Sequence, residues 1–195
     1  MDPAGDLTVK VVEYDYSTTD ARGNYPILKA ALMKVSREVL MNNSSYFKTM
    51  LGGQFKEAGS NIVEIHEDTV FSVELWFRAL HGTLIDDSYL IDREEMWNAI
   101  WLTRKYFFHI EKLNDWFATY WSRLNKPNLD MDDLKALLYP AQAFDHPVAF
   151  AYITKTLAHA GIGHIEEKNP SRHHQLHVEG RVIRKFLNLV PMSQL

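Results

Sequence analysis

The 195-residue chain contains no cysteine. This absence excludes disulfide bonds, zinc fingers, cysteine nucleophiles and iron–sulfur clusters held by thiolates. The chain also has no run approaching the roughly 18 consecutive apolar residues of a membrane-spanning helix. Its opening MDPAGDLTVK carries two acids and no apolar core, so we predict no signal peptide. We therefore expect a soluble protein of the cytoplasm or nucleus that does not contact membranes.

The chain also lacks a large excess of positive or negative charge. The chain has 21 Lys and Arg against 25 Asp and Glu, which gives a formal net charge of -4. This mild acidity argues against nucleic-acid binding by the whole chain. Hydrophobic residues make up 46% of the sequence and include 10 Phe, 9 Tyr and 5 Trp. That composition is typical of a folded protein with a sizeable core and excludes a disordered chain.

The motifs of common catalytic sites are absent. The sequence has no Gly-x-Ser-x-Gly and no glycine-rich loop long enough to hold a phosphate. The acidic pairs Glu94-Glu95 and Asp132-Asp133 fall in the first turns of predicted helices, where the helix dipole favours negative charge. We therefore predict that the protein is not an enzyme, with no catalytic residue and no cofactor.

Apolar periodicity divides the chain into an early part with strands and a later helical part. Residues 7–16, 27–35 and 61–65 have the alternation or composition of strands, and turn-forming residues fill 17–26. Two short helices are predicted between the second and third strands, capped by Ser36 and Ser44. Gly52 and Gly53 end the second of them, because glycine accepts the left-handed conformation that follows a helix.

Helical spacing dominates after residue 67. Asp68, Asp92 and Asp130 are predicted N-caps, and Asp92 with Glu95 forms a capping pair. Helices are expected over five stretches, and a sixth is expected near the C-terminus. Their approximate ranges are 68–81, 92–107, 109–124 (before the break NKPN), 130–139, 147–161 and 180–190. The predicted fold class is α+β.

The segment from Ser36 to Ile65 resembles the centre of a BTB/POZ domain. That family has a Val-Leu pair, a serine, a Tyr-Phe-x-x-Met-Leu run, a Phe-x-Glu element and a short strand in this order. The matching residues are Val39, Leu40, Ser44, Tyr46, Phe47, Met50, Leu51, Phe55, Glu57, Ile62, Val63 and Ile65. Further matches are the Asp-Leu-Thr-Val of residues 6–9, Leu80-His81-Gly82 and Lys105-Tyr106. The stretches that follow are similar to the tails of BTB proteins of filamentous fungi.

The resemblance implies a BTB/POZ-like domain over residues 6–122, a small sheet flanked by helices, and a helical C-terminal extension over 123–195. It implies a protein–protein interaction module, and specifically a substrate adaptor that joins a client to a cullin-type ubiquitin ligase. The expected cullin contact is Phe55, Lys56 and Glu57. The alternative is a self-associating BTB scaffold, such as a homodimer, in transcriptional or cytoskeletal assembly. Ser36 stands where the family usually has His, and no helix precedes the first strand, so the swapped dimer of zinc-finger-type members is not expected.

The C-terminal part concentrates histidine. His173, His174 and His177 form HHxxH, and His164 lies near Glu166 and Glu167. Imidazole and carboxylate groups ligate zinc, so a metal-dependent hydrolase is a distant third hypothesis. Because Pro170 and polar neighbours predict a loop, a solvated His-rich loop is the preferred interpretation, and no metal site is predicted.

Two further groups of residues have ordinary structural explanations. Aromatic residues recur at helical spacing before the NKPN break, which is typical of packing between two helices rather than of a cofactor site. They are Trp97, Trp101, Phe108, Trp116, Phe117 and Trp121. Arg181, Arg184 and Lys185 lie near Phe186 on the last predicted helix, and a solvated face explains them better than a nucleic-acid patch.

Overall fold

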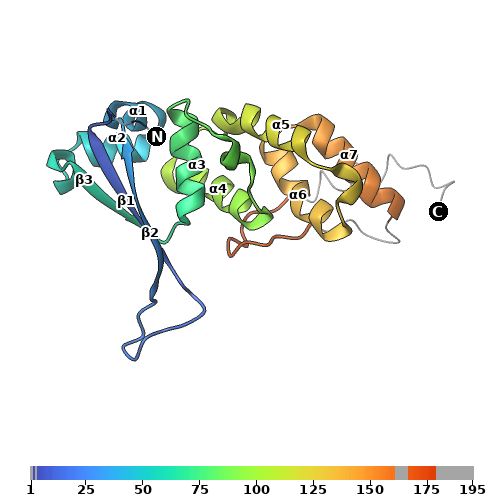
Figure 1. Cartoon of the computed structure of the whole chain (residues 1–195), viewed down its shortest axis with the longest axis horizontal. Coiled ribbons are helices and arrows are strands. Elements are labelled where there is room, and N and C mark those ends of the chain that lie inside the picture. Colours follow the sequence, from blue (N-terminus) through green and yellow to red (C-terminus); the bar gives the residue numbers. More distant parts are fainter. Residues whose placement is uncertain (1, 3, 161–166, 179–195) are drawn as a thin grey trace.

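A computed structural model describes residue 2, residues 4–160 and residues 167–178 of the chain. A small sheet and two short helices form one end, and longer helices extend away from it (Figure 1). The α+β class predicted from the sequence is confirmed. None of the helices described combines the length and the apolar character needed to cross a membrane.

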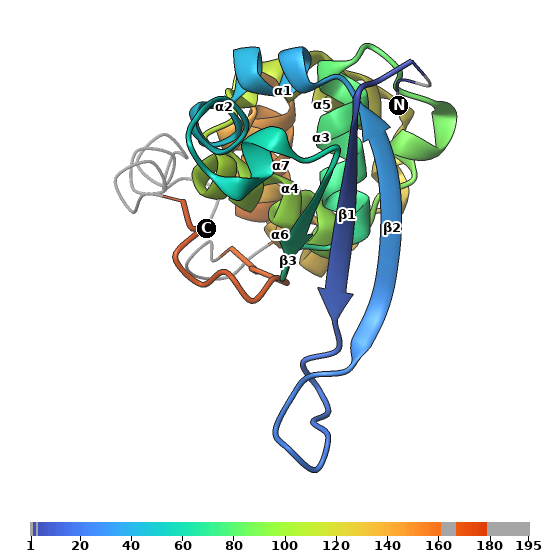
Figure 2. The same cartoon turned by 90° about the vertical axis from the view of Figure 1, so that its left-hand side faces the viewer.

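The sheet has three strands in the order β2-β1-β3. The central strand β1 (Leu7–Tyr14) pairs antiparallel with β2 (Ile27–Val35) and parallel with β3 (Ile62–His66). Alternate side chains of β1 lie buried against the helices, as its sequence predicts. Residues 15–26 between β1 and β2 form a long arm that projects from the body (Figures 1 and 2).

The two predicted short helices are present. α1 (Arg37–Asn43) begins at Ser36, whose hydroxyl accepts from Val39 N at 3.3 Å. α2 (Ser45–Gly52) begins at Ser44, whose hydroxyl accepts from Phe47 N at 3.0 Å. The expected left-handed end of α2 is wrong, because Gly53 has φ -92°. Glycine is needed there for space instead, since a Cβ on Gly53 would lie 2.7 Å from the Thr49 carbonyl oxygen.

Two helices pack behind the sheet. α3 (Val70–Leu80) is capped by Thr69 and not by Asp68 as predicted, and Gly82 follows it with φ 63° as expected. α4 (Arg93–Tyr106) is capped by Asp92, whose carboxylate accepts from Glu95 N at 2.8 Å. The helix predicted over residues 92–107 ends one residue earlier, at Tyr106. Phe107 adopts a left-handed conformation (φ 54°) that ends the helix and turns its ring to solvent.

The later helices form the far end of the molecule. A 3₁₀ turn (Ile110–Leu113) precedes α5 (Asn114–Arg123), so the helix expected from residue 109 begins later. α6 (Met131–Ala143) is capped by Asp130 and continues past the predicted end at Tyr139, because the helix accommodates Pro140. α7 (Pro147–Ala160) starts at its proline. The helix predicted over residues 180–190 lies outside the described residues.

One hydrophobic core connects these parts. It runs without interruption from β1 through α3, α4 and α5 to α6, α7 and Val178. Trp97 of α4 donates its Nε1 hydrogen to the Ala136 carbonyl of α6 at 2.8 Å and packs against Tyr139. Residues on either side of the predicted boundary at 122 therefore share one core.

Candidate functional site

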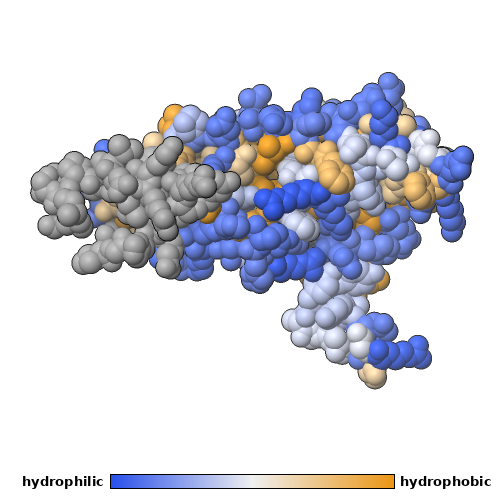
Figure 3. Space-filling view, turned by 180° about the vertical axis from the view of Figure 1, so that it is seen from behind, coloured by the Kyte–Doolittle hydropathy of each residue, from blue (hydrophilic) through white to orange (hydrophobic). Residues whose placement is uncertain are grey.

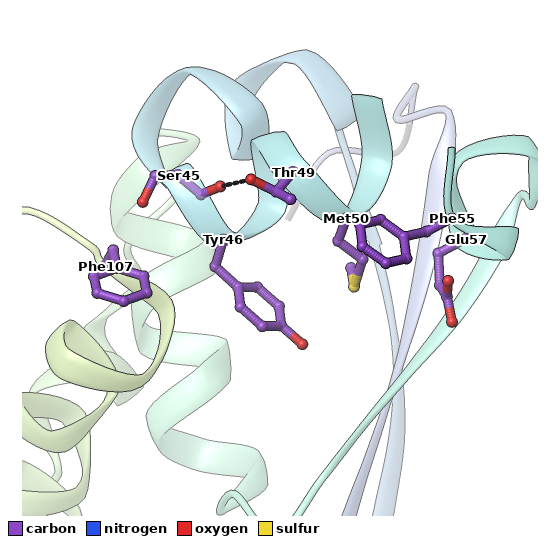
Figure 4. Close-up of a pocket in the computed structure, with 7 residues that line it drawn as sticks. All are labelled: Ser45, Tyr46, Thr49, Met50, Phe55, Glu57 and Phe107. Atoms are coloured by element: carbon purple, nitrogen blue, oxygen red, sulfur yellow. Dashed lines mark hydrogen bonds between the residues drawn. The ribbon is translucent and has the colours of Figure 1, made fainter. Parts of the chain in front are cut away.

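Phe55, Lys56 and Glu57 lie beside an apolar groove. Phe55 precedes a 3₁₀ turn (Lys56–Gly59), and 58% of its surface is exposed. The groove has a volume of about 480 Å³ and runs between α2, this turn and the end of α4 (Figure 4). Its lining residues are Ser45, Tyr46, Thr49, Met50, Phe55, Glu57 and Phe107. Patches of apolar surface also interrupt the mainly hydrophilic surface on the back of the body (Figure 3).

α2 presents the floor of the groove because of its helical spacing. Tyr46 and Met50 are four residues apart and share the open face of the helix (Figure 4). Phe47 and Leu51, each one position further along, are buried in the core and anchor the inner face of the helix. The Thr49 hydroxyl donates to the Ser45 carbonyl at 2.9 Å, so this polar side chain is hydrogen-bonded within α2.

A buried polar cluster supports the floor from below. Asp68 is only 4% exposed, and both of its oxygens accept from Lys105 Nζ at 2.9 Å. It also accepts from the Tyr106 hydroxyl, and the Tyr106 ring packs edge-on against Tyr46 with centroids 5.0 Å apart. Burial, together with the Asp68 charge, raises the pKa of Tyr106 far above its ordinary value. The hydroxyl therefore stays a neutral donor that fixes the position of the ring beneath Tyr46.

Phe107 closes the groove at the end of α4. Ser44 holds this end in place, because its hydroxyl donates to the Tyr106 carbonyl at 2.5 Å and its backbone bridges to Phe108. Phe108 turns inward and stacks on Trp76, whereas Phe107 is 60% exposed. Phe107 was not predicted from the sequence as a groove residue. The two adjacent phenylalanines were the available signal, since a helix end at Tyr106 forces them to opposite sides.

The groove has the chemistry of a binding surface. Its walls are aromatic rings and a methionine, and Glu57 stands half-buried at one rim with Lys56 exposed beside it. Burial raises the pKa of Tyr46, and the negative charges of Asp68 and Glu57 add to this effect. The charge of Glu57 therefore acts on the Tyr46 hydroxyl at the floor of the groove. An apolar side chain of a partner fits such walls, with the carboxylate fixing its orientation.

The histidines take separate positions. His173 stacks on Trp101 of α4 with centroids 4.5 Å apart, while His174 and His177 are exposed. Burial lowers the pKa of His173 to about 4, and the charges of Arg172 and Lys105 add to this, so the ring is neutral near pH 7. Within residues 2, 4–160 and 167–178, no group of three or more His, Asp or Glu side chains is placed to hold a metal ion.

The segment 167–178 that carries these histidines is irregular, as predicted, so His173 and His177 do not share a helix face. Asn169 organises it by donating to the carbonyls of His173 and Leu176 at 3.0 and 3.1 Å. His164, Glu166, Arg181, Arg184, Lys185 and Phe186 lie outside the described residues. Of the aromatic residues at helical spacing, Trp97, Phe108, Trp116, Phe117 and Trp121 are buried, which confirms packing as their role.

Glu95, near the start of α4, gives a pH-dependent contribution to stability. Burial raises the pKa of its carboxyl from 4.5 to about 7, the Thr69 hydroxyl bonded to it opposes this, and the charges of Glu13 and Asp92 add to it. Because the folded pKa is above the unfolded one, the stabilisation is full below the unfolded pKa and is lost as the pH rises through about 7.

We predict that Glu95→Gln, which keeps an acceptor for Thr69, stabilises the protein by about 1–2 kcal/mol near pH 8 and has almost no effect near pH 4. Chemical denaturation across this pH range measures the difference. The neighbouring Glu94 is exposed, so Glu94→Gln is the matched control and should not change the pH dependence. An equal effect of Glu95→Gln at both pH values would contradict the assignment.

The chain was also compared with known proteins. No protein-family model matches it, and no curated protein matches its sequence. Its function is therefore inferred from its own residues and their geometry.

Proposed function

We propose that this chain is a BTB/POZ-like protein–protein interaction module whose groove binds an apolar segment of a cullin-type scaffold. The observation that carries the proposal is the exposure of Phe55 within an apolar groove. A phenylalanine that only closed the local core would be buried, whereas Phe55 lies 58% exposed beside Met50. The predicted contact residues therefore border a surface with room for a partner.

The positions of the residues that carry the BTB resemblance support the proposal. The apolar members Leu40, Phe47, Leu51, Val63 and Ile65 are buried in one core. Ser44 caps α2 and also bonds the end of α4, so one hydroxyl fixes both walls of the groove. Lys105 and Tyr106 meet on Asp68 beneath it. Ser44, Lys105 and Tyr106, three of the matched positions, thus hold the groove in place.

The exposed aromatic rings are expected to supply most of the binding free energy. Covering apolar surface contributes about 25 cal/mol per Å², so a single aromatic anchor that becomes fully covered is a dominant contact. Glu57 adds orientation, because a cation or amide of the partner near its carboxylate distinguishes one binding direction from the other. A partner segment with an apolar side chain followed by a basic or amide group fits this arrangement.

We predict that Phe55→Ala weakens cullin binding by about 2 kcal/mol, roughly 30-fold, because the anchor loses its ring. Glu57→Ala should weaken binding by about 1 kcal/mol, mainly through lost orientation. The measurement is a pull-down of a recombinant cullin of the BTB-recruiting class by the purified chain, followed by titration of each variant.

Leu90→Ala serves as the matched control, because Leu90 is 77% exposed and does not line the groove. It should bind like the unaltered chain. If both Phe55→Ala and Glu57→Ala bound the cullin as tightly as the unaltered chain, the groove would not be part of the interface.

A further inference from the structure

A second pocket, here called the arm pocket, lies where the arm of residues 15–26 leaves the sheet (Figures 1 and 2). It has a volume of about 610 Å³ and shares no lining residue with the groove. Three tyrosines, a histidine and a glutamate supply most of its walls. The lining residues are Tyr14, Tyr16, Gly23, Asn24, Tyr25, His66 and Glu67. None of them is among the residues that carry the BTB resemblance.

The sheet forms the base of the arm pocket. Val12 of β1 pairs with His66, the last residue of β3, so Tyr14 lies on the same face just beyond the end of β3. A hydrogen bond joins the Tyr14 hydroxyl to His66 Nδ1 at 3.0 Å, and the two rings stack with centroids 6.1 Å apart. The register of β1 with β2 shifts after Glu13, and such a shift bends the strands where the arm begins.

The arm supplies two further rings. The Asp15 N–H donates to the Pro26 carbonyl at 2.9 Å, which closes the arm where it leaves the sheet. Tyr16 and Tyr25 stand next to this bond with ring centroids 4.9 Å apart, and Tyr14 meets Tyr16 edge-on at 6.4 Å. Tyr16 and Tyr25 are 40% and 46% exposed, so both rings keep free surface beside the pocket.

Glu67 adds a negative charge to these rings. Among the residues that the structure describes, its carboxylate has no hydrogen-bond or ion-pair partner, and only its backbone is bonded. Nearby acids are engaged, since Glu64 pairs with Lys10 at 2.9 Å and Asp20 accepts from Asn24 N at 2.8 Å. Glu67 also has a φ of 71°, a conformation that is unfavourable for residues other than glycine and that clusters at ligand sites.

A cation of the chain itself shows which chemistry this region accepts. Arg172 places its guanidinium over the Tyr16 ring, 4.1 Å from the centroid, and donates to the Glu67 carbonyl. A guanidinium is attracted to the negative face of an aromatic ring, and its planar donors suit oxygen acceptors. Arg172 does not line the arm pocket, so the Tyr25 ring and the Glu67 carboxylate stay open to a second cation.

We propose that the arm pocket binds an arginine side chain of a partner protein. The guanidinium stacks on the Tyr25 ring and donates two hydrogen bonds to the Glu67 carboxylate. Arginine fits better than lysine, because only the guanidinium combines a flat face for the rings with paired donors for a carboxylate. A trimethylated lysine is attracted to the rings as well, but its head group has no hydrogen to donate to Glu67.

Nuclear magnetic resonance titration of the full chain with the peptide acetyl-Gly-Gly-Arg-Gly-Gly-amide tests this proposal. Backbone signals of residues 14–26, 66 and 67 should shift in a saturable way. A matched peptide with citrulline keeps the shape of arginine without its charge, and it should bind at least about tenfold more weakly. Peptides with lysine or trimethyllysine should also bind more weakly. Equal binding of the citrulline peptide, or tighter binding of either lysine peptide, would overturn the proposal.

Two variants test the walls of the arm pocket. Tyr25→Ala should weaken binding of the arginine peptide about tenfold, and Glu67→Gln about fivefold. Both variants should remain folded, because both side chains are exposed. Phe55→Ala and Glu94→Gln are the matched controls, since both positions are exposed and lie outside the arm pocket.

Both controls should bind the arginine peptide like the unaltered chain. Absence of saturable binding by the unaltered chain, or equal affinities for Tyr25→Ala and Phe55→Ala, would contradict the assignment. Tyr25→Ala should in turn leave cullin binding unchanged, because Tyr25 does not line the groove. Failure of the arm pocket proposal can therefore be recognised separately from failure of the groove proposal.

Discussion

Replacing Asp68 by alanine is expected to lower the free energy of unfolding by about 3 kcal/mol. Asp68 is almost fully buried and accepts from Lys105 and from the Tyr106 hydroxyl. Alanine would leave the Lys105 ammonium without its counter-charge and the buried hydroxyl without an acceptor. Removing one partner of a buried pair costs more than the pair contributes, because the other group stays desolvated.

Denaturation by urea at neutral pH measures this loss. Asp86→Ala is the matched control, since Asp86 also pairs with a cation, Arg123 at 3.1 Å, but is almost fully exposed. That exposed pair should contribute less than about 1 kcal/mol. If Asp68→Ala were as stable as Asp86→Ala, the cluster beneath the groove would not have the role assigned to it.

Replacing Trp97 by alanine is expected to cost about 4 kcal/mol. Its side chain is fully buried, bonds the Ala136 carbonyl and packs on Tyr139, so it joins α4 to α6. The loss combines a large cavity with an unbonded carbonyl in the core. Because one core spans both sides of residue 122, we expect the weakened protein still to unfold in a single transition.

Trp97→Phe separates the two contributions. It keeps an aromatic ring near Tyr139 and removes the donor to Ala136, so the expected loss is about 2 kcal/mol. Denaturation followed by both tryptophan fluorescence and circular dichroism provides the comparison. Separate transitions, with α6 and α7 lost while the sheet persists, would contradict the shared core.

Local signals predicted much of the fold. The alternation in β1 and the caps Ser36, Ser44, Asp92 and Asp130 are local properties of the chain, and the structure places each of them as expected. Asp68 was wrongly predicted as the N-cap of α3 because Asp and Thr are both good caps. The Asp68 carboxylate instead bonds Lys105, which lies 37 positions away in the sequence.

The groove could be predicted only in part. Phe55 and Glu57 followed from an ordered motif, but the motif contained no information on the opposite wall. Phe107 completes that wall because α4 ends at Tyr106 in a left-handed turn held by Ser44. Helical periodicity continues through Phe107, so its spacing places it inside the predicted helix over 92–107. The tertiary bond from Ser44 decides its direction, and such a bond has no local sequence signal.

Titration of the purified chain with a recombinant cullin of the BTB-recruiting class tests the central claim most directly. The groove predicts saturable binding of the unaltered chain that Phe107→Ala weakens roughly tenfold, since Phe107 is exposed and forms one wall. Leu90→Ala should bind with the original affinity. Absence of binding by the unaltered chain, or equal affinities for Phe107→Ala and Leu90→Ala, would contradict the proposal.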